Sequence, residues 1–214
     1  MHRFLFSTFL FMFLSMSVSF QAVAVPIDFQ GFPPCNMQAC NSVAAVEKWP
    51  ELKPTGVQQV TFYGYDLLIP AKGVETRSNY SFRQFDFDSK RWLSLSVFVL
   101  ADMDELFKAS RYTMVDWASI VFTQTPESKV PDTPDEAYAW YSSLISKTVF
   151  VGGNMVTQYH KAPLTVYVIN ETHSENDVLM VVSTDSPEVL LKVEVFGFEK
   201  PEIMQLISGL SQSH

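Results

Sequence analysis

The sequence contains little of the material from which metal and catalytic centres are built. It has two cysteines and four histidines in 214 residues, whereas zinc centres need several Cys or His ligands at close spacing. It also lacks the short fingerprints of serine hydrolases, zinc proteases, P-loop enzymes and dinucleotide-binding enzymes. We therefore expect no cofactor and no metal, and no motif designates a catalytic residue.

Positive charge is scarce as well. Fifteen Lys and Arg residues stand against 23 Asp and Glu residues, which gives a formal net charge of −8. A nucleic-acid binder needs a basic stripe that neutralises phosphates, so this composition argues against nucleic acid as a partner. Moderate acidity otherwise favours solubility and indicates no particular partner.

Only one long apolar run occurs, and it lies at the N-terminus. Arg3 precedes an uncharged stretch over residues 4–20, and the sequence AVA at residues 22–24 is a small-residue cleavage site. These are the three parts of a secretory signal peptide, so we predict a cleaved leader over residues 1–24 and a periplasmic or secreted protein. The alternative is a retained anchor, although a spanning helix needs about 20 apolar residues. No later run is comparable, and we expect no stable membrane insertion after cleavage.

Both cysteines, Cys35 and Cys40, lie in a proline-rich segment that we interpret as an N-terminal arm over residues 25–55. In an exported protein, two cysteines favour a disulfide bond, whereas a redox pair more often has C-x-x-C spacing. Closing so short a loop stabilises the fold by about 2 kcal/mol in the chain-entropy model. We predict a structural disulfide that pins the arm, and a short helix over residues 42–49.

The remainder, residues 56–214, is predicted to form one domain, because removing 24 of 214 residues leaves a length typical of a single domain. Alternating apolar and polar residues predict strands, and a helix with N-cap Thr133 and Pro134 at its first position follows a longer one. The predicted strands are 57–70, 80–88, 91–100, 149–151, 155–161, 163–170, 177–184 and 189–198. The predicted helices are 102–123, one that starts at residue 134, and one near 203–210. Residues 71–79 are predicted to form a loop. This order, with hairpin-length links, predicts an α+β fold with a largely antiparallel sheet flanked by helices.

Three segments resemble the PsbP-like fold family, small exported proteins named for an extrinsic subunit of the oxygen-evolving photosystem. YGYDLLIPAKG (63–73) is similar to the opening strand of that fold, and the two central helices are similar to its middle. LLKVEVFGFEKPEIMQLISGL (190–210) resembles its last strand and closing helix. The resemblance covers residues 56–211 and implies an α/β/α sandwich with a binding or assembly role, but it gives no site residues.

Four residues are candidates for contact with a ligand. Asp86 and Asp88 alternate on one face of a strand, as a paired carboxylate or calcium site requires, although alternation also explains a solvent-facing side. His160 ends a strand and has no partner four residues away. Trp140 lies beside the predicted buried stripe of its helix, where a partly exposed ring is suited to line a groove.

A full fold pattern without a catalytic constellation predicts an exported periplasmic binding or accessory protein without catalytic activity. We expect it to act by contact with a small ligand or with another envelope protein. Two alternatives stay open: a periplasmic hydrolase using Asp86, Asp88 or His160, which requires those side chains to meet in one cleft, and an immunity-type inhibitor of an envelope toxin. The sequence leaves the oligomeric state undetermined.

Overall fold

A computed structural model describes residues 38–170 and 175–213 of the chain. The predicted leader and Cys35 lie outside these ranges, while Cys40 is buried within them. The strands are β1 (Ala45–Lys48), β2 (Val57–Phe62), β3 (Tyr65–Pro70), β4 (Val74–Ser78), β5 (Phe82–Asp88), β6 (Arg91–Val99), β7 (Met155–Lys161), β8 (Leu164–Asn170), β9 (Asn176–Ser183), β10 (Ser186–Phe196) and β11 (Ser211–Gln212). The helices are α1 (Glu105–Ala109), α2 (Met114–Thr123), α3 (Pro134–Phe150) and α4 (Lys200–Ser208), with 3-10 turns η2 (Gln38–Asn41) and η3 (Leu100–Asp102).

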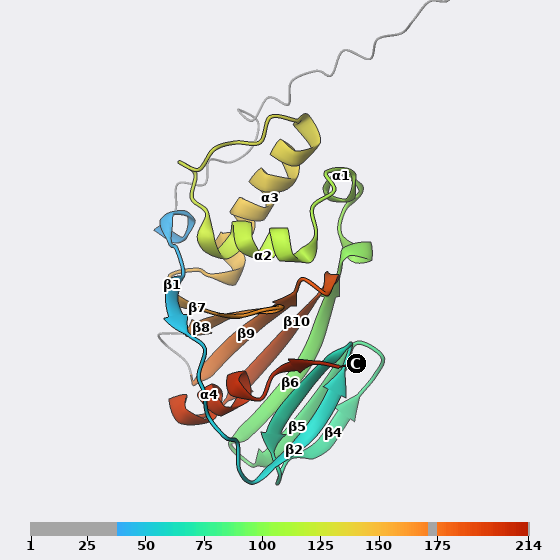
Figure 1. Ribbon diagram of the computed structural model, residues 1–214, viewed down its shortest axis with the longest axis vertical. Coiled ribbons are helices and arrows are strands. Elements are labelled where there is room, and N and C mark those ends of the chain that lie inside the picture. The colour runs from blue at the N-terminus through green and yellow to red at the C-terminus, as the bar shows by residue number, and fades with distance from the viewer. Residues whose placement is uncertain (1–37, 171–174, 214) are drawn as a thin grey trace, which may run out of the picture.

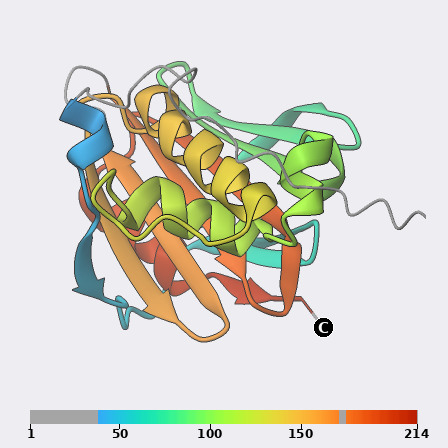
Figure 2. The ribbon, with the colours of Figure 1, turned by 90° about the horizontal axis from the view of Figure 1, so that it is seen from above.

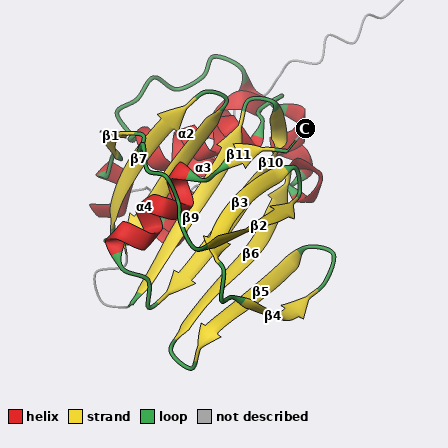
Figure 3. Ribbon diagram, turned by 60° about the horizontal axis from the view of Figure 1, so that its bottom comes forward, coloured by secondary structure: helices red, strands yellow, loops and turns green. Residues whose placement is uncertain are grey.

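The fold is α+β, with a largely antiparallel sheet flanked by helices, as the sequence predicts. Eight strands pair in the order β1-β7-β8-β9-β10-β6-β5-β4, and three more form a small sheet in the order β11-β3-β2. Within this part of the chain only the β1–β7 pairing is parallel. Helices α2 and α3 lie over one face of the large sheet (Figures 1 and 2), whereas α4 and the small sheet lie against the other (Figure 3).

Strand alternation divides the interior into two cores. Successive side chains of a strand point to opposite faces, so Leu93 and Val193 face α4 and the small sheet. Leu190 and Met180 point the other way and pack with Trp117 of α2. The predicted hairpin around residues 88–90 is confirmed as the β5–β6 pair.

The long helix predicted over residues 102–123 is wrong, because the chain there forms η3, α1 and α2 in succession. Asp104 caps α1 by accepting a hydrogen bond from the Phe107 amide, and the Ser110 hydroxyl donates to the Phe107 carbonyl at the helix end. Arg111 then adopts φ +66°, and Thr113 caps α2. Local side-chain hydrogen bonds compete with helix continuation, so an apolar periodicity that runs on conceals a turn.

Three shorter predictions are also corrected. Residues predicted as a helix at 42–49 include strand β1, whose parallel pairing with β7 overrides local preference. Strand β4 lies within the predicted loop 71–79, paired with β5. Residues 149–151, predicted as a strand, complete α3 instead. Gly152, with φ +59°, donates from its amide to the Lys147 carbonyl and ends that helix.

Candidate functional site

Asp86 and Asp88, the candidates for a paired carboxylate site, have separate hydrogen-bond partners. The register of β5 against β6 shifts between these two residues. Asp86 accepts a hydrogen bond from the Gln84 side-chain amide at 2.8 Å, and Asp88 accepts one from the Lys90 amide at 2.8 Å, which closes the hairpin turn. The two carboxylates therefore have different local partners, and neither hydrogen bond joins them.

Trp140 and His160 also lie apart from each other. Trp140 is 3% exposed, so the expectation of a partly exposed ring is wrong, and its indole N–H donates to the Gln124 side chain at 2.6 Å. The position opposite α2 makes it part of a small core. His160 is exposed on β7, with Nδ1 3.0 Å from the Thr165 hydroxyl.

The sheet order keeps the acid and histidine candidates apart. Strands β5 and β7 are separated by β6, β10, β9 and β8, and five strand spacings amount to about 24 Å. Asp86 and His160 therefore do not meet in one cleft, as the hydrolase alternative requires.

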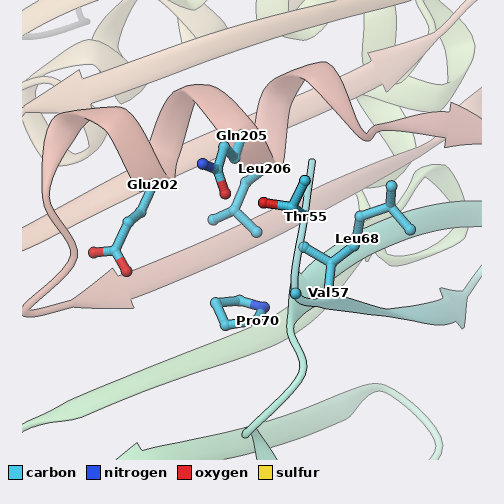
Figure 4. Close-up of a pocket in the computed structure, with 8 residues that line it drawn as sticks. Thr55, Val57, Leu68, Pro70, Glu202, Gln205 and Leu206 are labelled. Atoms are coloured by element: carbon cyan, nitrogen blue, oxygen red, sulfur yellow. The ribbon is translucent and has the colours of Figure 1, made fainter. Parts of the chain in front are cut away.

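Helix α4 instead lies between two hollows that the sequence did not predict. The first, which we call the hairpin hollow, has a volume of about 210 Å³ and lies between α4 and the β2–β3 hairpin. In Figure 4, Glu202, Gln205 and Leu206 project from the helix toward the hairpin. The remaining lining residues are Thr55, Gly56, Val57, Leu68 and Pro70.

The charge in the hairpin hollow is already compensated. Glu202 pairs with Arg91 at 2.5 Å through one carboxylate oxygen, and its other oxygen accepts from the Glu199 amide at 2.9 Å. Among the described residues, the other polar side chains that line this hollow are neutral, namely the Gln205 amide and the Thr55 hydroxyl. This hollow thus offers an apolar wall with weak polar groups.

The second hollow, the Lys200 hollow, lies on the other side of α4, against β1, β7, β8 and β9, and has a volume of about 230 Å³. Its floor is formed by buried side chains, among them Tyr159 at 5% exposure. Its rim carries charges from three elements: Glu47 on β1, Asp177 on β9 and Lys200 on α4. The other lining residues are Thr157, Val168, Asn170, Ile203 and Met204.

Local structure holds the Asp177 side chain and the backbone of Lys200 in place. Lys200 is the first residue of α4, whose start is fixed by Pro201 in the first turn and by the Glu199–Glu202 contact. Asp177 faces Asn170 across the β8–β9 ladder, and the Asn170 amide donates to Oδ1 of Asp177 at 2.7 Å. The described residues make no hydrogen bond to the second carboxylate oxygen of Asp177.

The charged side chains on the rim of the Lys200 hollow are not used in ion pairs among the described residues. Within residues 38–170 and 175–213, neither Glu47 nor Lys200 has an ion-pair partner. Burial, and secondarily the nearby Glu47 carboxylate, raises the pKa of the Tyr159 hydroxyl, so this group stays a neutral hydrogen-bonding phenol. Opposite charges, a phenol and an amide therefore meet around one small space.

A third hollow of about 270 Å³ borders the start of α3, beside Arg111, Asp135 and Glu136. Two of its polar residues belong to the helix cap, because the Thr133 hydroxyl donates to Glu136 and accepts from the Glu136 amide. That cap confirms the predicted helix start with Pro134 at the first position.

Lys147 is the one described lysine that is fully buried, with 0% exposure. Its ammonium donates to three main-chain carbonyls: Cys40 at 3.4 Å, Ser42 at 2.5 Å, and Gln124. Burial lowers its pKa to about 8. The group is enclosed on all sides and joins the N-terminal segment to α2 and α3, so its role is structural.

Sequence reasoning missed the Lys200 hollow because its charges lie far apart along the chain. Only the closing helix was visible, from its apolar periodicity, and Lys200 adjoins its start. Nothing in the sequence marks Glu47 or Asp177 before the strands are paired.

Among the described residues, no group of three or more His, Cys, Asp or Glu side chains is arranged to hold a metal ion. None of the helices described is long and apolar enough to cross a membrane.

Comparison with known proteins yields no family. No family model matches the chain, and no curated protein matches it. Among solved structures, a protein from Bacteroides thetaiotaomicron VPI-5482 aligns with 8% identity and a TM-score of 0.34 over 71% of this chain, and the match spans 46% of that protein. A mutant of the protein Mog1 aligns with 5% identity and a TM-score of 0.38 over 74% of this chain and 96% of Mog1. The resemblance to the PsbP-like family stays a prediction.

Proposed function

We propose that this chain is an exported binding or accessory protein that works without catalysis and takes a small polar ligand in the Lys200 hollow. The observation that carries the proposal is the convergence of uncompensated charges on a hollow with an apolar floor. Ligand sites combine apolar walls with a few placed polar groups, and this hollow has both. The hairpin hollow has no free charge with which to orient a ligand.

Export is supported by the N-terminal pattern of a basic residue, an apolar run and the AVA motif at residues 22–24. A ligand-binding role is favoured over the hydrolase alternative because Asp86 and His160 lie on strands about 24 Å apart. No feature of the described residues favours the immunity-type alternative. Another envelope protein that receives or delivers the ligand is compatible with this role.

Export is tested by intact-mass measurement of the protein isolated from its native host. We expect a mature chain that begins at Val25 and is found in the periplasmic or extracellular fraction. A chain that begins at Met1 in the cytosolic fraction contradicts this half of the proposal.

Ligand binding is tested by thermal denaturation of the full chain with a panel of amino acids, sugars, organic acids and nucleotides. A compound that binds only the native state raises the melting temperature. We expect at least one compound to do so, and to lose the effect in the Lys200→Gln, Asp177→Asn double variant. The matched control is Lys72→Gln with Asp185→Asn, two exposed residues in turns that line no described hollow. A panel without effect, or equal effects in both double variants, overturns the proposal.

A further inference from the structure

The charges of the Lys200 hollow have opposite signs and come from opposite walls. Asp177 stands on the large sheet, and Lys200 stands on α4, which covers that sheet. Both side chains face one space without pairing with each other. A ligand that enters this space meets a carboxylate on one side and an ammonium on the other.

The two charged groups differ in how firmly they are held. Asp177 is half-buried, and the Asn170 amide, which donates to Oδ1 at 2.7 Å, fixes the orientation of its carboxylate. Lys200 is exposed but anchored at its backbone by the start of α4. Glu47 is exposed on the edge strand β1, three strand spacings or about 14 Å from β9, and we assign it a lesser role.

The size of the hollow limits the ligand. Its volume of about 230 Å³ is smaller than the roughly 300–1,000 Å³ of sites for drug-sized ligands. A single amino acid or a dipeptide fits within this space.

We infer that the Lys200 hollow binds a small zwitterion of amino-acid size, with its protonated amine at Asp177 and Asn170 and its carboxylate at Lys200. This inference rests on the proposed binding function and specifies the ligand class. A ligand with only an amine faces the Lys200 ammonium, and a ligand with only a carboxylate faces Asp177 and Glu47. A zwitterion matches both walls, and the floor of Tyr159, Val168 and Ile203 accepts its carbon chain.

The test is a titration by isothermal calorimetry with zwitterions of increasing charge separation. The probes are glycine, β-alanine, γ-aminobutyrate and glycylglycine, and the single-charge analogues are acetate, butyrate and propylamine. We expect at least one zwitterion to bind at least tenfold more tightly than every single-charge analogue. A single-charge analogue that binds as tightly as the best zwitterion overturns the inference.

Variants locate the interaction. Lys200→Gln and Asp177→Asn are each expected to weaken the best zwitterion at least tenfold, whereas Lys72→Gln and Asp185→Asn leave it unchanged. Glu47→Gln is expected to have a smaller effect than Asp177→Asn. Native affinity in Lys200→Gln or in Asp177→Asn overturns the assignment.

The same assay separates two kinds of failure. If no zwitterion binds but another compound of the wider panel does, in a manner that requires Lys200, the zwitterion inference fails and the binding function stands. If no compound binds at all, both fail.

Discussion

Replacing Lys147 by Met tests how the N-terminal segment is held on the domain. The Lys147 ammonium is fully buried and donates to the carbonyls of Cys40, Ser42 and Gln124. Methionine matches the length and the apolar stem but leaves one buried and two part-buried acceptors without a donor. A fully buried acceptor without a partner costs about 1–3 kcal/mol and a part-buried one costs less, so the direct loss is roughly 6 kcal/mol, below the roughly 9 kcal/mol upper limit for three fully buried acceptors.

Removing the buried charge offsets part of that loss. Burial lowers the pKa of Lys147 from 10.5 to about 8, and at about 1.36 kcal/mol per pKa unit the charged form is disfavoured by roughly 3 kcal/mol. We therefore expect Lys147→Met to lower the free energy of unfolding by about 3 kcal/mol at neutral pH. Urea denaturation measures this difference, with Lys72→Met as the exposed control.

The pH dependence gives a second readout with a definite sign. The folded pKa of Lys147 lies below its unfolded value, so between pH 8 and 10.5 the unfolded state binds more protons than the folded state. Stability contributed by this group therefore rises with pH across that window. The difference between the native protein and Lys147→Met should grow by up to about 3 kcal/mol, because titrating tyrosines affect both proteins alike.

Hydrogen exchange identifies the residues at which Lys147→Met loses stability. We expect faster amide exchange over residues 38–44 in Lys147→Met, because two of the three carbonyl partners lie there. A variant within about 0.5 kcal/mol of the native protein, the spread of ordinary surface substitutions, with unchanged exchange in this segment, would refute the reasoning.

Two further predictions concern the arm and the entrance to α4. Cys35 and Cys40 are predicted to form a disulfide bond, so alkylation followed by mass spectrometry should modify neither cysteine before reduction and both cysteines after it. Reduction should lower the free energy of unfolding by about 2 kcal/mol. Alkylation of either cysteine without reductant contradicts the prediction. Gly197 has φ +71°, and a Cβ there would lie 2.7 Å from the Lys90 carbonyl oxygen. Gly197→Ala should therefore lower the free energy of unfolding by about 1–3 kcal/mol, measured by urea denaturation, whereas Gly153→Ala, with open space around it, should change it little.

Structural features that depend on residues close together in the sequence could be predicted from it. The β5–β6 hairpin follows from alternation on either side of a polar turn, and the start of α3 follows from Thr133 and Pro134, whose capping chemistry acts within one helical turn. The break at Arg111 was not visible because apolar spacing continues through it. Strand β1 was missed because its only support is the long-range pairing with β7.

The same distinction explains why the candidate residues of the sequence differ from those that line the Lys200 hollow. Asp86 and Asp88 attract attention because they are neighbours, yet a register shift and a turn use them separately. Glu47, Asp177 and Lys200 carry no shared motif, since three different elements bring them together. A site of this kind becomes visible only once the strand order is known.

The construction of the Lys200 hollow also determines how its ligand is best detected. Glu202 holds the start of α4 through Arg91 and the Glu199 amide, and the Arg91 guanidinium lies 4.9 Å from the centre of the Phe198 ring. The helix start that carries Lys200 is thus in place before a ligand arrives, which reduces the ordering cost of binding. Little conformational change is then expected, so spectroscopic signals of movement should be small. Stabilisation of the folded state is the stronger signal, about 2.7 kcal/mol at a ligand concentration one hundred times Kd.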